Sequence, residues 1–200
     1  MPKSQGYGKN ATMQGRAPNR RLQRRWPSDD MKINKSTRHS KITGDFGEIV
    51  VLYWLSKYGF ECASVDHTGI DIIARNPYTQ EVMGISVKSR SRGEGTEEEH
   101  ISIPNDNFSK AEAACKAFGC VPYFAIVVDA GDTIRGFILP TAHLLEISPK
   151  GKTASGWKMT QGYLRQYAAD PQIKTFEFQA KTTKWWGQQP AAGAADKPRA

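Results

Sequence analysis

Long apolar runs and cysteines are both scarce in this sequence of 200 residues. No run approaches the roughly 20 apolar residues that a membrane-spanning helix needs, so no membrane partner is expected. The N-terminus also lacks the short apolar core of a secretory signal. The three cysteines, Cys62, Cys115 and Cys120, are an odd number without a CxxC pair, which argues against a disulfide framework or a zinc knuckle. We therefore expect a cytoplasmic protein that uses no small-molecule cofactor.

Positive charge is concentrated near the N-terminus. The net charge is +8, and residues 1–41 alone hold 11 Lys and Arg against 2 Asp and Glu, a balance of +9. The run NRRLQRR at 19–25 is too polar to fold alone and indicates a flexible arm that contacts nucleic-acid phosphates. The arginines of this arm are Arg20, Arg21, Arg24 and Arg25. A solubilising tail without a specific partner is the alternative.

Composition divides the chain into four stretches. We expect a disordered basic arm at 1–40, a core domain at 41–148, an extension at 149–184 that packs on the core, and a disordered tail at 185–200. The core begins with a helix in FGEIVVLYWLSKYG, which Ser40 or Thr43 would cap. This segment has apolar residues at helical spacing (Phe46, Ile49, Val50, Tyr53, Trp54) and more on its other side, so the helix should be well buried.

The remainder of the core predicts five strands and a second helix. Strand patterns occupy 60–65, 70–75 and 82–89, and the turn RNPYTQE joins the last two as a hairpin. The helix DNFSKAEAACKAFG follows, capped by Asn105 or Asp106 and closed by Gly119. VPYFAIVV then reads as a strand buried on both faces, with TIRGFILP as its antiparallel neighbour. The order α, β, β, β, α, β, β predicts one mixed sheet with a helix on each face.

Three charged residues stand where a plain core would not place them. Glu48 lies inside the first helix without a basic partner at i+3, i+4 or i+7, Asp71 interrupts the apolar strand GIDIIA, and Lys88 lies in GISVKSR. An ion pair between Asp71 and Lys88 would explain two of them. Glu48 by itself is compatible with exposure near the helix N-terminus, where a carboxylate favours the helix dipole.

A divalent metal ion explains all three residues together. Carboxylates and a backbone carbonyl can hold Mg²⁺ with several waters still bound to it. A lysine beside the metal can orient or deprotonate one of those waters for attack on a phosphodiester. Ser89, Arg90 and Arg92 continue the lysine strand as a polar, basic rim that suits a phosphate backbone.

The segment 44–93 resembles the PD-(D/E)xK nuclease superfamily, and most of all its archaeal Holliday-junction resolvase-like branch. That branch combines a helix glutamate, a strand similar to GIDIIA and a strand similar to GISVKSR. The resemblance implies an α/β, restriction-endonuclease-like αβββαβ core with a mixed central sheet flanked by helices, and a DNA endonuclease dependent on Mg²⁺ or Mn²⁺. It implies Glu48 and Asp71 as metal-binding acids, the carbonyl of Val87 as a backbone ligand and Lys88 as the catalytic lysine. It also implies a homodimer.

Ser86 departs from the family pattern, because it stands at the second acidic position and is neutral. Some restriction enzymes with Ser/Thr-x-Lys bring a glutamate from further along the chain, and Glu97, Glu98 and Glu99 are candidates here. The same run also reads as a charged loop. Two carboxylates with weaker metal affinity, or a loss of catalysis, are the remaining alternatives. Ile70 stands where the signature often has proline, a minor drift.

Other candidate contacts are weaker. His67 in DHTG is placed to touch a phosphate or is simply solvated, and Trp185 and Trp186 would stack on unpaired bases, cover the core or contact a protein. The function predicted is a metal-dependent endonuclease that hydrolyses DNA phosphodiester bonds, either structure-specific or in repair and recombination. The alternatives are a DNA-binding module on the same fold that does not cut, and an unrelated α/β domain in which Asp71 and Lys88 form a structural pair.

Overall fold

The computed structural model describes residues 35–181. The predictions for the four arginines of the arm, for Trp185 and Trp186, and for the tail lie outside the described residues. No helix in the described part of the chain has the length and apolar character to cross a membrane. The elements in chain order are α1 (His39–Lys57), β1 (Glu61–His67), β2 (Ile70–Arg75), β3 (Val82–Ser91), β4 (Ile101–Pro104), α2 (Asn105–Phe118), β5 (Val121–Ala130), β6 (Thr133–Pro140), α3 (Thr141–Ile147), β7 (Ala154–Trp157), α4 (Gln161–Ala169) and β8 (Lys174–Gln179).

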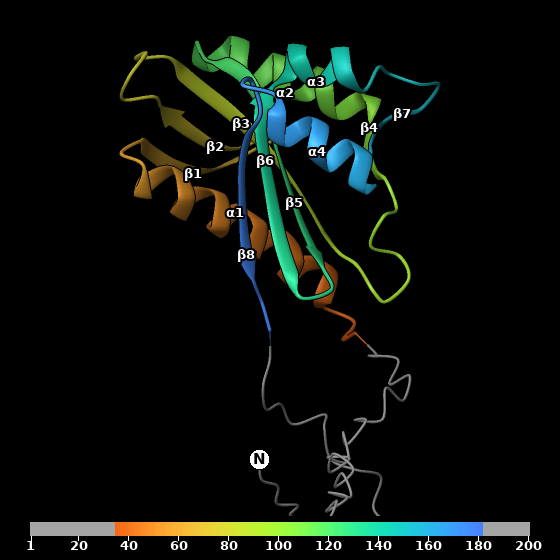
Figure 1. Ribbon diagram of the computed structural model, residues 1–200. Coiled ribbons are helices and arrows are strands. Elements are labelled where there is room, and N and C mark those ends of the chain that lie inside the picture. The colour runs from red at the N-terminus through yellow and green to blue at the C-terminus, as the bar shows by residue number, and fades with distance from the viewer. Residues whose placement is uncertain (1–34, 182–200) are drawn as a thin grey trace, which may run out of the picture. The chain divides into compact units, whose positions relative to one another are not determined.

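A mixed sheet forms the centre of the fold, and helices lie on both of its faces (Figure 1). Its strand order is β1-β2-β3-β5-β6-β8, in which β3 and β5 are parallel and the other neighbours are antiparallel. The predicted hairpin of β2 and β3 and the predicted antiparallel pair of β5 and β6 are confirmed. The short β4 was not predicted, and it pairs with β7 in a second, two-stranded sheet.

Strand β5 is apolar from residue 121 to 128, and both of its faces are covered there. Phe124, Ile126 and Val128 join the core that contains α2, α3 and α4, while Ala125 and Val127 join the core under α1. This is the environment that a continuous apolar strand requires.

The first helix is less buried than its sequence predicts. Val50, Val51 and Leu55 are buried against the sheet. Four other large apolar side chains of α1 stay in solvent, with exposed fractions of 55% for Ile42, 37% for Phe46, 64% for Ile49 and 58% for Tyr53. The prediction of a well-buried helix is therefore wrong, because α1 alone covers its face of the sheet and only one stripe of a helix can meet a sheet.

The ends of the two long helices also differ in part from the sequence prediction. α1 begins at His39, inside the stretch assigned to the arm, and Arg38 is its N-cap residue without a side-chain cap. Thr43 lies inside the helix and its hydroxyl donates to the His39 carbonyl at 2.8 Å, so it is not a cap. Pro104 precedes α2 as its N-cap residue, and Gly119 ends the helix with a left-handed φ of 67° as predicted.

The segment after α3 is part of the same folded body. β8 forms one edge of the central sheet beside β6, and Phe176 packs under α1. On the other face, Trp157 and Tyr167 are fully buried, with ring centroids 3.9 Å apart. The extension therefore contributes one strand of the central sheet and two of the largest core side chains.

Candidate active site

The candidate site lies where β2 and β3 stop pairing with each other. Their register runs from Arg75↔Val82 to Ile72↔Ile85. At the next position of β2, a side chain replaces the backbone as the partner of β3. The Oδ2 of Asp71 accepts a hydrogen bond from the backbone N–H of Val87 at 2.6 Å. A short bond of this kind to a carboxylate is charge-assisted, and it fixes Asp71 at the opening between the strands.

Glu48 reaches the same place from α1. The preceding residue, Gly47, lies so close to β3 that a side chain there would collide with Ser89, so glycine is what allows the helix to approach. Burial is the largest influence on the Glu48 carboxyl and raises its pKa, and the negative charge of Asp71 raises it further. Two carboxylates that repel each other at a half-buried position are thus brought together from two elements.

Lys88 is held beside these carboxylates by neutral groups. Its ammonium donates to the hydroxyl of Ser86 at 2.9 Å and to the carbonyl of Val87 at 3.2 Å. Among the described residues, the ion pairs within 4.0 Å do not include Asp71 with Lys88, so the structural pair considered as an alternative is not formed. Burial lowers the pKa of Lys88, while the negative charges of Asp71 and Glu48 oppose that shift.

The donor atoms suit a hard divalent cation. Glu48, Asp71 and the carbonyl of Val87 offer only oxygen, which is the ligand type that Mg²⁺ and Mn²⁺ prefer. A cation between the carboxylates would also remove the repulsion that raises the pKa of Glu48. Within residues 35–181, no three side chains of His, Cys, Asp or Glu come together as a metal-binding group, so a protein-bound metal would rely on two carboxylates, a carbonyl and water.

The glutamates expected as replacements for the missing acid are not brought to this site. Glu99 pairs with Arg92, with 3.1 Å between its Oε2 and the guanidinium. Glu97 and Glu98 do not join a group of three metal-binding side chains either, since the described residues contain no such group. The EEE run is therefore a charged loop, which was the plainer of the two interpretations.

The two arginines of the predicted basic rim, Arg90 and Arg92, differ in their contacts. Arg90 is exposed and donates to the carbonyl of Ser89 at 2.7 Å, so its remaining donors face solvent. Arg92 instead donates to Glu99 and to the carbonyls of Glu99 and His100, and its side chain is only 16% exposed. Arg92 therefore holds the loop that leads to β4, while its buried Nε has no partner among the described residues, and its predicted phosphate contact stays a prediction.

His67 is used in packing at the other side of the sheet. Its ring meets Phe118 of α2 edge to face, with centroids 5.1 Å apart. The hairpin that follows it is pressed against α2, since a side chain at Gly69 would collide with the backbone of Lys110. The structure thus gives His67 a contact with α2, and its predicted phosphate contact stays a prediction.

Comparison with known proteins finds a structural likeness. No protein-family model matches the chain, and no curated protein matches it. Among solved structures it is similar to Hjc, a Holliday junction resolvase from the archaeal hyperthermophile Archaeoglobus fulgidus. The sequence identity is 19%, the match covers 57% of this chain and 88% of that chain, and the TM-score is 0.43.

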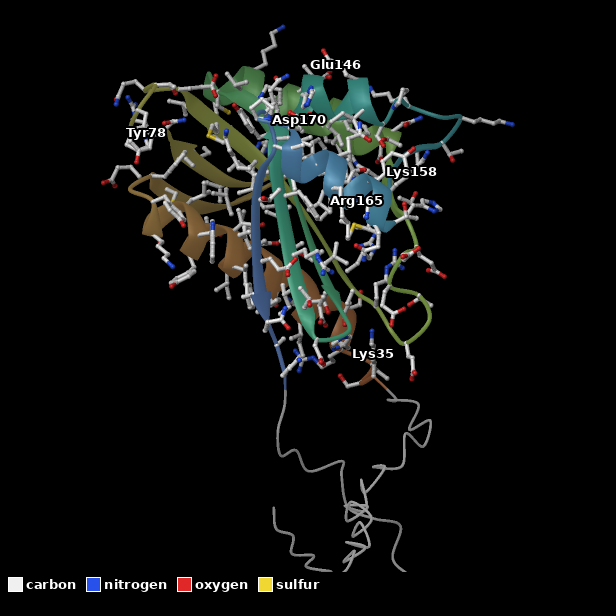
Figure 2. All side chains as sticks on the ribbon, in the orientation of Figure 1. Lys35, Tyr78, Glu146, Lys158, Arg165 and Asp170 are labelled. Carbon is white, nitrogen blue, oxygen red and sulfur yellow. The ribbon has the colours of Figure 1, made fainter. Side chains whose placement is uncertain are left out.

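Sequence reasoning missed two charged groups near the site. Asp106 at the start of α2 is close enough to raise the pKa of Lys88. Lys35 precedes α1, and its ammonium donates to the carbonyl of Ser91 at 2.7 Å and to the Ser91 hydroxyl at 3.1 Å (Figure 2). The available signal was weak in both cases, because each residue reads as an ordinary solvated charge at a helix start.

Proposed function

We propose that the protein is a divalent-metal-dependent endonuclease that hydrolyses DNA phosphodiester bonds, on a structured or damaged DNA as in repair or recombination. The observation that supports the proposal is the arrangement around Val87: its N–H donates to Asp71, its carbonyl accepts from Lys88, and the negative charge of Asp71 is near enough to raise the pKa of Glu48. Carboxyl groups whose pKa is raised by burial and by a neighbouring negative charge are concentrated at functional sites.

Each residue has a separate task in this proposal. Mg²⁺ or Mn²⁺ bound by Glu48, Asp71 and the Val87 carbonyl would supply charge stabilisation for the phosphodiester and an activated water. Lys88 orients that water through its ammonium, which Ser86 keeps in position by accepting one of its hydrogen bonds. The hydrogen bond from Val87 keeps Asp71 in place before any ligand arrives.

The test is a cleavage assay with matched variants. Linear, nicked, branched and single-stranded DNA would be incubated with Mg²⁺ or Mn²⁺. Lys88→Met should lower the cleavage rate by at least about 100-fold, since positioned proton-transfer groups contribute that much or more. Lys152→Met, at an exposed loop position, is the matched control and should cut like the parent. Cleavage that survives Lys88→Met, or that proceeds in excess EDTA, would contradict the proposal.

A DNA-binding module that does not cut is the second candidate, and one observation favours it. Ser86 is buried, with 2% of its surface exposed, and supplies a neutral hydroxyl where the nuclease pattern has a carboxylate. In this case DNA binding would be sensitive to salt and insensitive to EDTA, and no DNA of the panel would be cut.

We also propose that the protein forms a homodimer. The exposed apolar side chains of α1, Ile42, Phe46, Ile49 and Tyr53, support this, because such a patch on a small protein commonly marks an interaction surface. Sedimentation of the parent and of Ile49→Lys tests it, and a parent that sediments as a monomer at high concentration rules the dimer out. The expected cytoplasmic location stays a prediction.

A further inference from the structure

A cavity of about 500 Å³ lies between the start of α1 and the second half of β3, next to the candidate active site. Its lining includes the basic residues Lys35, Lys88 and Arg90, six serine and threonine residues, His39 and Gly44. None of these described residues is acidic, three are lysine or arginine, and most of the others bear a hydroxyl. This composition suits an anion with several acceptor oxygens.

The cations of the cavity are placed at its two ends. Lys88 marks the end at the candidate active site, and Lys35 is held at the other by Ser91, whose hydroxyl in turn donates to Asp129 at 2.8 Å. Arg90 lies between them on β3. Among the ion pairs of the described residues, Arg90 has no carboxylate partner, so its charge is available to a ligand.

Several polar groups at the cavity walls lack a partner. The Nε2 of His39 and the Oγ of Ser89 are buried and make no hydrogen bond. The first turn of α1 has no acidic residue and no side-chain cap, so its free N–H groups add positive potential to the same place. Buried polar atoms without partners are uncommon, and a bound anion or the water around it would satisfy them.

We propose that this cavity binds the phosphodiester group next to the one that is cut, on the same nucleic-acid strand. From Lys88 to Arg90 or Ser91 the rise along β3 is about 7–10 Å, which matches neighbouring phosphates of a strand laid along it. The open cavity continues from the active site and presents cations at both ends, as an extended polyanion requires. The inference rests on the proposed function for the position of the scissile phosphate, but its tests measure binding without metal.

The first test removes charge. Binding of a fluorescent 12-nucleotide single strand and of the corresponding duplex to the full chain would be followed by anisotropy in EDTA, across a range of salt concentrations. Lys35→Ala combined with Arg90→Ala should reduce the slope of log Kd against log salt by about 2, one for each lost phosphate contact. The control combines Lys116→Ala with Arg165→Ala, two exposed positions, of which Figure 2 labels Arg165, and should change the slope little.

The second test fills the cavity without changing charge. A side chain at Gly44 would meet nothing within 4 Å, and leucine is a better helix former than glycine, so Gly44→Leu should fold. It should weaken oligonucleotide binding by about tenfold, because it blocks charge-assisted hydrogen bonds to one phosphate. Gly162→Leu on α4 is the matched control, since its surroundings are equally open, and it should bind like the parent.

The outcomes separate this inference from the proposed function. The cavity proposal is overturned if the two double variants have the same slope of log Kd against log salt. It is also overturned if Gly44→Leu binds like the parent, even if the protein cuts DNA. Altered binding in both tests with no cleavage by the parent leaves the cavity proposal standing and refutes the nuclease. If inorganic phosphate shifts the NMR signals of His39 and the oligonucleotide does not displace it, the cavity takes free phosphate and the strand proposal is wrong.

Discussion

Two substitutions of Asp71 should separate its structural role from metal binding. In Asp71→Ala the backbone N–H of Val87 loses the acceptor at 2.6 Å in a half-buried gap. An unsatisfied donor costs about 1–3 kcal/mol, and relief of the repulsion with Glu48 returns part of this, so we expect a loss of about 1–2 kcal/mol. For a domain of this size that corresponds to a fall in Tm of about 2–8 °C. In Asp71→Asn the amide oxygen still accepts the bond, so stability should equal or exceed that of the parent.

Urea unfolding with and without Mg²⁺ would measure both roles. Metal at ten times its Kd should raise the free energy of unfolding of the parent by about 1.4 kcal/mol. Asp71→Asn should lose most of this increment although it is as stable as the parent in EDTA. Asp66→Asn, at an exposed position of β1, serves as the control for the charge change. The reasoning is refuted if Asn destabilises as much as Ala, or if Mg²⁺ stabilises Asp71→Asn as strongly as the parent.

Two further predictions concern stability away from the site. Gly84→Ala should lower the free energy of unfolding, measured in urea, by about 1–3 kcal/mol through overpacking. The new methyl group would lie 2.5 Å from Cys115 Sγ and 2.6 Å from Cys120 Sγ. An unchanged urea midpoint would show that the two thiols move aside freely. His143 and Asp170, 2.8 Å apart, should make stability depend on pH. The hydrogen bond from His143 lowers the pKa of Asp170, so this contribution is present above its ordinary value of 3.8 and is lost as the pH falls through the lowered pKa. Burial lowers the pKa of His143, but hydrogen bonds to two carboxylates outweigh this and raise it, so its contribution is complete below 6.5 and is lost as the pH rises through the raised pKa. His143→Gln should therefore lower the free energy of unfolding most between pH 3.8 and 6.5 and progressively less above it; a difference from the parent that does not vary with pH would contradict this.

Most of the central sheet could be predicted from local patterns, but its edge strand β8 could not. The hairpin of β2 and β3 and the doubly buried β5 follow from turn residues and apolar runs that are contiguous in sequence. In β8, the segment KTFEFQ alternates polar and apolar residues, as a strand does. The segment itself does not indicate that its partner is β6, which is more than thirty residues away. Such pairings depend on the assembled core, into which Trp157 and Tyr167 are packed.

The candidate site shows the same division between local and assembled information. Glu48, Asp71 and Lys88 were recognisable because each is a charge in an apolar element. The contacts of Arg92 could not be foreseen, because sequence cannot show that its two terminal nitrogens donate to the loop at Glu99 and His100. Lys35 was missed for the opposite reason, since only the folded chain brings it to the end of β3.

Ser86 decides how freely Lys88 can act, and replacing it with glutamate should have two opposing effects. A carboxylate at this position would lie against the Lys88 ammonium, which now donates to the Ser86 hydroxyl at 2.9 Å. Added negative charge beside Asp71 should tighten Mg²⁺ binding, which calorimetry would detect as a lower Kd. The new ion pair would also hold Lys88 more strongly than a neutral hydroxyl does, because hydrogen bonds between charged groups are about twice as strong. Tighter metal binding together with a lower maximal cleavage rate would show that serine keeps the lysine available. An unchanged Kd for Mg²⁺ would instead show that this position does not face the metal.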